Sequence, residues 1–330
     1  MRRARSIVVA AALVVPALAA GGSLSALEGA NGWYTWQVAA AADAPAWCCF
    51  DWHRNTRIPG PCNLDQDGAY GSCDSPAPPG AQVRIYAQLE AGEPRKLRVL
   101  SPACAVEAAE GVTDLGAVEV AESFDWLRSR VAIDSRVSDE ALLAIAMHAG
   151  ERPLRWLVDA ANGGAEGEIR EQAIFWLGQV RISESADVIE HLMFSAEPAG
   201  IRQHAAFVLS QSDAPRRINV LIRQGRRDPD GETRAQAWFW LAQTGASRGE
   251  EAILQAIATD RQQSVREEAV FALSQLPEDR AVDALLTVLH DERLHHDVRE
   301  KALFWLAHSE SERGLAAIER LLAGGDAARH

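Results

Sequence analysis

A short motif recurs five times in the second half of the chain. Its copies start at Ile169, Ile201, Thr233, Val265 and Val298. Successive copies are separated by 32, 32, 32 and 33 residues. A fixed period of this length is typical of stacked repeat arrays, in which each unit packs only against its neighbours. The period therefore constrains the fold more strongly than any other feature of the sequence.

Four positions of the motif hold one residue type in every copy. The second is arginine, the fifth alanine, the seventh phenylalanine and the ninth leucine, and the eleventh is glutamine except at His308. Each copy is followed by a turn and a second apolar stretch, so each unit is predicted to be a pair of antiparallel helices. A weaker copy at 137–161 extends the array to six units over residues 137–330. The predicted fold class is therefore mostly α, an α-α solenoid.

Residues 265–291 carry the motif most clearly, as VREEAVFALSQLPEDRAVDALLTVLHD. This stretch resembles the short HEAT-like repeats that are also found in phycobilisome lyases, and the resemblance extends over roughly residues 137–330. It implies an α-α solenoid that usually binds proteins. It implies no shared chemistry, because the repeat motif is structural.

Residues 1–20 are predicted to be a signal peptide, with Arg2, Arg3 and Arg5 before an apolar run that begins at Ile7. The run is shorter than the roughly 20 residues that cross a bilayer, although an uncleaved anchor is the alternative. We therefore expect a periplasmic or secreted protein with no stable membrane insertion after cleavage.

The chain is acidic, and cleavage would change its formal net charge from −13 to −16 by removing three arginines. Such a charge is repelled by phosphate backbones and anionic headgroups, so we expect no nucleic acid partner. Basic proteins or peptides are electrostatically easier partners. The alternative is that the acidity only keeps the protein soluble.

Residues 31–110 form a small domain of different composition, which holds all five cysteines: Cys48, Cys49, Cys62, Cys73 and Cys104. In an exported chain these predict disulfides, with one thiol left over. Adjacent side chains diverge, so Cys48 and Cys49 are expected to have different partners unless one is free. The alternative is a thiol or metal site, but no C-x-x-C spacing supports it.

Alternating apolar residues predict β-strands in this domain at 33–38 and 83–89, and a turn at 92–94 predicts a hairpin partner at 97–100. Residues 111–136 are acidic and rich in small residues at their start. We expect them to form a linker, followed by a segment that caps the first repeat.

Residues 63–68 copy the first half of a calcium loop, and Asp74 falls where the loop's last ligand is expected. The candidate ligands are Asn63, Asp65, Asp67 and Asp74. Aspartate replaces the usual glutamate at the last position, and Pro59 and Pro61 preclude the usual preceding helix. A solvated acidic turn is the alternative, so no cofactor is required. A bridge between Cys62 and Cys73 would close this loop.

The repeated phenylalanines and glutamines form two columns along the stack, with tryptophans beside some of the phenylalanines. These residues are Phe175, Trp176, Phe207, Phe239, Trp240, Phe271, Phe304, Trp305, Gln179, Gln211, Gln243 and Gln275. They are candidates for binding a protein or peptide, because aromatic side chains dominate binding hot spots. The alternative is that the rings hold the repeats together. The repeated arginines are expected to form weak exposed pairs with acids of the preceding loop, such as Asp228, Asp260 or Asp297.

No motif predicts an enzyme: a nucleophile elbow, a glycine-rich phosphate loop and H-E-x-x-H are all missing. His290, His295 and His296 lie close together, but surface histidines are common and we expect no metal there. The sequence therefore favours an exported protein-binding scaffold. The alternative is a ligand- or metal-handling protein, or an enzyme, with its site in the Cys-rich domain.

Overall fold

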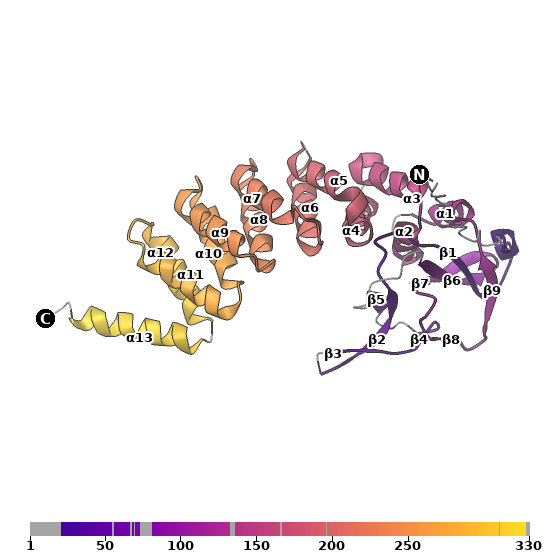
Figure 1. The fold of residues 1–330 in the computed structure, drawn as a ribbon, viewed down its shortest axis with the longest axis horizontal. Helices are drawn as coiled ribbons and strands as arrows, with labels where there is room; N and C mark the ends of the chain where they lie inside the picture. Colours follow the sequence, from indigo (N-terminus) through magenta and orange to yellow (C-terminus); the bar gives the residue numbers. More distant parts are fainter. Residues whose placement is uncertain are drawn as a thin grey trace, which may run out of the picture.

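The computed structural model describes residues 21–327 except 55, 67, 69, 73–80, 133–135, 166, 196 and 310. Figure 1 shows a β-rich N-terminal part and a curved row of paired helices that ends at α13. The predicted signal peptide, residues 1–20, lies outside the described residues. Within the part that is described, none of the helices has both the length and the apolar character needed to cross a bilayer.

A four-stranded sheet with the order β7-β6-β1-β9 is the main layer of the N-terminal part. Its strands are β1 (Gly32–Ala39), β6 (Gln82–Glu90), β7 (Glu93–Leu100) and β9 (Val112–Ala117). The strands β1, β6 and β7 are antiparallel, which confirms the predicted strands at 33–38 and 83–89 and the hairpin partner at 97–100. One face of this sheet carries Trp36 and Ile85 into the main core, and the other carries Trp33 and Leu100 into a small second core.

Five short strands complete the N-terminal part, after a short 3₁₀ helix at Leu24–Leu27. They are β2 (Trp47–His53), β3 (Thr56–Pro59), β4 (Cys62–Asn63), β5 (Tyr70–Ser72) and β8 (Val106–Glu107). The strand β2 lies between β3 and β5, and β4 pairs with β8.

Two disulfides hold these strands together, Cys48–Cys104 and Cys49–Cys62. Successive side chains of a strand point to opposite faces, so the two adjacent cysteines of β2 reach different partners as predicted. The sequence left the pairing open, and the bridge between Cys62 and Cys73 that would close the candidate calcium loop does not form, because Cys62 pairs with Cys49. Cys73 itself lies outside the described residues.

The stretch 111–136 differs from the predicted linker. Its first part is β9, which pairs parallel to β1 from Trp33 to Gln37, and its second part contains α1 (Val120–Arg128). Phe124 and Leu127 of α1 are buried in the core that the sheet shares with the repeats. An acidic, small-residue sequence resembles a loop, but an edge strand needs only one apolar face, so composition alone could not identify it.

A buried chain of hydrogen bonds joins the sheet to the repeats. Trp36 donates its indole N–H to Ser123 Oγ at 2.8 Å, and Ser123 lies 2.8 Å from His148 Nε2. His148 Nδ1 faces the Ala144 carbonyl, so Nδ1 carries the proton and Nε2 accepts from the serine. The guanidinium of Arg181 donates to the His148 carbonyl at 2.7 Å. The β-rich part is therefore fixed to the first two repeat units.

Six helix pairs follow, which confirms the predicted α-α solenoid. The first helices are α2 (Arg136–Met147), α4 (Gly167–Val180), α6 (Ala199–Gln211), α8 (Gly231–Gln243), α10 (Gln263–Ser274) and α12 (His296–Ala307). The second helices are α3 (Glu151–Asp159), α5 (Ile182–Phe194), α7 (Arg217–Arg227), α9 (Ser247–Thr259), α11 (Glu278–His290) and α13 (Glu312–Ala327). A π-helical turn at Ala160–Gly164 follows α3.

The repeated alanines and leucines of the motif form the core of the array. The alanines at the fifth position are fully buried, and the leucines at the ninth are at most 2% exposed. Small side chains let successive helices approach closely. At Gly225 of α7 the approach is closer still, because a Cβ atom there would lie 2.6 Å from the indole of Trp238.

The repeated arginines do not form the weak exposed pairs that the sequence suggested. Arg234 is 1% exposed, and its guanidinium contacts both carboxylate oxygens of Asp260 at 2.9 and 3.0 Å. Asp260 lies in the loop after α9, which leads to the next unit, and the preceding loop supplies the carbonyl of Asp228. Arg202 pairs in the same way with the buried Asp228. The prediction was wrong because helix periodicity does not reveal which loop folds back over the arginine.

The two ends of the array differ. The sheet and α1 cover the first unit, whereas the last unit leaves Leu303, Phe304 and Leu315 at least 37% exposed. Among the described residues only one other large apolar side chain, Ile58, is as exposed. Among the described residues, the array is therefore covered at its N-terminal end, and its last unit exposes apolar side chains.

Candidate functional site

The aromatic side chains of the repeat motif form one row across the first helices, here called the aromatic row. It consists of Phe175, Trp176, Phe207, Phe239, Trp240, Phe271, Phe304 and Trp305. The rings of Phe175 and Phe207 are stacked 6.5 Å apart, and those of Phe239 and Phe271 are stacked 5.7 Å apart. One ring per unit at the same position of the first helix brings the rings of neighbouring units together.

The tryptophans of the aromatic row fill the steps at which no phenylalanine pair stacks. Trp240 lies 4.9 Å from Phe207 of the preceding unit, and Trp305 lies 4.8 Å from Phe271. Where Val208 or Ala272 stands in place of tryptophan, the phenylalanines stack directly. The row therefore alternates between two kinds of contact. The sequence showed which units lack tryptophan, but not that the tryptophan reaches backwards.

The aromatic row both packs the units together and faces the solvent. Its phenylalanines are half-buried in α4, α6, α8 and α10, and Phe304 of the last unit is 47% exposed. The predicted stacking role is thus present. The predicted binding role remains a prediction. The phenylalanine rings are partly exposed, so a partner could contact them.

The glutamine column lies beside the aromatic row. Gln211 and Gln243 are exposed, and Gln179 and Gln275 are half-buried. The Gln243 side-chain amide lies 3.5 Å from the Gln275 side-chain oxygen of the next unit. In the last unit His308 takes the place of glutamine, and its ring lies 4.1 Å from that of Phe304.

A groove of about 750 Å³ lies between α8 and α10, and we call it the α8–α10 groove. Its floor includes Phe239, Trp240 and Phe271 of the aromatic row. Its rim carries the carboxylates of Glu232 and Glu268, which are exposed and form no ion pair or hydrogen bond with any described residue. The described residues that line the groove include no lysine or arginine.

Asp230 is a third acid of the α8–α10 groove, but it has a structural role. Its carboxylate accepts from the Thr233 backbone N–H at 2.7 Å and from the Thr233 hydroxyl at 2.8 Å. These hydrogen bonds lower the pKa of Asp230 and cap the start of α8. The carboxylates available to a ligand are therefore those of Glu232 and Glu268.

A second cavity, of about 560 Å³, lies where the β-rich part meets the repeats. Trp47 of β2 is 6.0 Å from Trp176, so the aromatic row continues into this junction. The Tyr70 hydroxyl donates to Glu140 at 2.9 Å, and Arg98 contacts the same carboxylate at 3.1 Å. Burial and the neighbouring Glu140 raise the pKa of Tyr70, so this phenol is neutral. Tyr70, Arg98 and Glu140 are thus paired with one another, whereas the buried indole N–H groups of Trp47 and Trp176 have no hydrogen-bond partner among the described residues.

The candidate calcium loop is described only in part. Asp65 accepts hydrogen bonds from the Trp33 indole N–H at 2.9 Å and from the Ala109 backbone N–H at 2.7 Å. The Asn63 side chain accepts from the Asp65 backbone N–H at 3.0 Å. Both carboxylate oxygens of Asp65 thus have protein donors, which lower its pKa. Asp67 and Asp74, the other two candidate ligands, lie outside the described residues.

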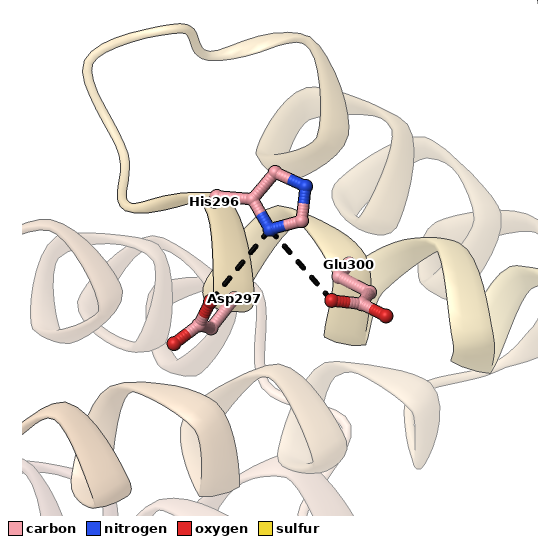
Figure 2. A group of neighbouring side chains, drawn as sticks. All are labelled: His296, Asp297 and Glu300. Carbon is pink, nitrogen blue, oxygen red and sulfur yellow. Dashed lines mark ion pairs between the residues drawn. The ribbon is translucent and has the colours of Figure 1, made fainter.

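Figure 2 shows His296, Asp297 and Glu300 at the start of α12. His296 Nδ1 lies 3.6 Å from an Asp297 oxygen and 3.7 Å from a Glu300 oxygen. The three groups have the spacing of metal ligands, but all three are exposed and already pair with one another. We assign no ion to them.

Comparison with known proteins agrees with the geometry of the helices. A family model of HEAT repeats matches residues 154–242 and 218–307. The helical part is a HEAT-like repeat array. A comparison with proteins of curated function finds no match, and the resemblance to phycobilisome lyases is not confirmed.

One solved structure similar to the HEAT-like array is human deoxyhypusine hydroxylase in complex with glycerol. It is 15% identical, and the match covers 61% of this chain and 90% of that chain with a TM-score of 0.32. At this TM-score the similarity supports no inference about this chain.

Proposed function

We propose that this protein is an exported scaffold that binds a protein or peptide on the first-helix face of its HEAT-like array. The observation that carries the proposal is the aromatic row, which runs through five units while remaining partly open to solvent. Half-buried aromatic rings are rigid and partly desolvated, and such rings supply most of the energy at binding hot spots.

Export is part of the same proposal. The predicted signal peptide motivates it, and two disulfides in the small N-terminal part are in keeping with an oxidising compartment. We also propose that the negative charge of the chain prevents it from binding nucleic acid.

Photo-cross-linking from the groove tests the binding role in the producing cell. A photoreactive residue replaces Gln236, which lines the α8–α10 groove, and in a matched chain it replaces Gln255 on α9. We expect a specific cross-link to one protein from position 236 and none from position 255. Equal yields from both positions, or none from a folded and exported chain, would contradict the proposal.

A pair of alanine variants separates binding from stability. Phe239 and Phe194 are both half-buried phenylalanines, but Phe194 lies on the second helix α5. Both Phe239→Ala and Phe194→Ala remove a ring and should lower the melting temperature. Only Phe239→Ala should also reduce the cross-link from position 236 at a temperature where both variants are folded.

The second candidate is a ligand-handling protein or enzyme with its site in the Cys-rich part. The cavity of about 560 Å³ at the junction favours it. A native mass above that of the oxidised polypeptide would support this candidate, and bound metal would be seen in the same spectrum.

A further inference from the structure

Ion pairs between neighbouring units lie on the second-helix face of the array. Arginines there pair with carboxylates of the preceding unit, as in Arg223–Glu190, Arg280–Glu250 and Arg313–Asp283. Other carboxylates of this face, such as Glu251 and Glu319, have no partner among the described residues. On the first-helix face, four exposed glutamates have no described side-chain partner. They are Glu168, Glu171, Glu232 and Glu268. Two of these carboxylates, those of Glu232 and Glu268, lie beside the aromatic row in the α8–α10 groove.

At one end of the aromatic row, a lysine of the chain itself lies over a phenylalanine ring. The ammonium of Lys301 lies 6.0 Å from the centre of the Phe304 ring, within the range of a cation–π contact. Within the part of the chain that the structure describes, no cation lies over Phe239 or Phe271, although the carboxylates of Glu232 and Glu268 flank them. Rings and carboxylates together form a site for a cationic side chain that the chain itself does not fill.

We propose that the α8–α10 groove binds an extended basic segment of the partner protein. This proposal rests on the proposed function and specifies the partner's chemistry. A lysine or arginine lies over Phe239 and Phe271, its aliphatic stem on the rings and its charge between Glu232 and Glu268. A cationic side chain suits both features, because its stem is apolar and its head pairs with carboxylates.

The size of the groove and the spacing of the units agree with an extended segment. A groove of about 750 Å³ holds several side chains. Neighbouring packed helices lie about 8–10 Å apart. An extended chain rises about 3.3 Å per residue, so successive units face about every third residue of the partner.

A peptide titration tests the proposal on the full chain. The probe is a fluorescent nine-residue peptide of three Arg-Ser-Gly repeats, and its control has glutamine in place of arginine. The variant is Glu232→Gln with Glu268→Gln. The matched control is Glu251→Gln with Glu319→Gln, which removes two exposed and unpaired carboxylates from second helices.

We expect the arginine peptide to bind the wild type and the glutamine peptide to bind at least about tenfold more weakly. The groove variant should lose about fivefold to tenfold in affinity for the arginine peptide. The matched control should change by less than about twofold, because distant exposed charges are screened.

Two results would overturn the proposal. Equal binding of both peptides, or an equal loss in both variants, would show that the groove does not select cations. If position 236 still cross-links a protein in the cell, the scaffold function survives and only the basic partner is wrong. If position 236 captures nothing, the scaffold function fails as well.

Discussion

His148 Nε2 lies 2.8 Å from Ser123 Oγ in a completely buried contact between the loop after α2 and the helix α1. Ser123 in turn accepts from Trp36 of the sheet at 2.8 Å. A serine and a histidine this close resemble a catalytic pair, but neither is accessible to a substrate. Each side chain satisfies the buried hydrogen-bonding group of the other, and together they join the β-rich part to the array.

This contact predicts a loss of stability in acid. Burial lowers the pKa of His148 to about 4. In the unfolded chain a histidine takes up a proton near pH 6.5. Acidification from pH 6.5 to 4 therefore favours the unfolded state, by about 3 kcal/mol at the end of this interval. Stability above pH 6.5 is not affected by this group.

Urea unfolding of the wild type and His148→Gln from pH 7.5 to pH 4 checks this. We expect the variant to be less stable at pH 7.5 and the difference between the two proteins to narrow as the pH falls. Two curves that stay parallel over the whole range would show that His148 does not link folding to pH.

The arginine contacts predict unequal effects of the same substitution. Burial raises the pKa of Asp260, but hydrogen bonds from Arg234 and Gln262 outweigh it and hold this pKa below its usual range. Arg234→Ala would leave that carboxylate buried and unpaired, at a cost of about 3–5 kcal/mol. Arg266 contacts only the Asp260 carbonyl at 3.2 Å, so Arg266→Ala should cost far less. Equal shifts of the two variants in chemical denaturation would refute this order.

Gly225 predicts a steric effect that can be separated from helix propensity. Gly225→Ala places a Cβ 2.6 Å from the Trp238 indole, and we expect a loss of about 1–3 kcal/mol. Gly200 lies in α6 with open space around it, so Gly200→Ala should be neutral or stabilising by up to about 1 kcal/mol. Thermal unfolding measures both, and a stabilised Gly225→Ala would contradict the packing of α7 against α8.

The two disulfides should differ in their contribution to stability. Cys48–Cys104 spans 56 residues and Cys49–Cys62 spans 13. By loop entropy the first stabilises by about 4 kcal/mol and the second by about 3 kcal/mol. Calorimetry of the double serine variants compares them, and a larger loss from the shorter loop would show that loop entropy does not dominate.

The sequence predicted the repeated helix pairs and three strands of the main sheet, and it missed pairings that depend on single contacts between distant segments. The 32-residue period predicted the helix pairs, because the same side chain must fill the same place in every unit. The pairing of β9 with β1 and of Cys49 with Cys62 depends on single contacts between distant segments, which leave no period. Trp238 shows the same limit: it is fully buried, but in the sequence it is one tryptophan of a pair around Phe239.

The sequence predicted that the aromatic residues form a column. It did not predict which neighbouring unit each tryptophan contacts. Position 7 of the motif fixed the phenylalanines on one side of the first helix. That Trp240 contacts the unit before it, rather than the unit after it, depends on how the helices are inclined to one another. Helical periodicity within one unit does not contain that information.

The first and last described units of the array differ in mechanical stiffness. Near the sheet, Trp36, Ser123 and His148 anchor the first unit, whereas among the described residues α12 and α13 pack against one neighbouring unit. In a chain of units stabilised by nearest neighbours, units with fewer contacts open first. Within the described part of the chain, the array is therefore expected to be stiffest beside the sheet and to bend most readily at α12 and α13.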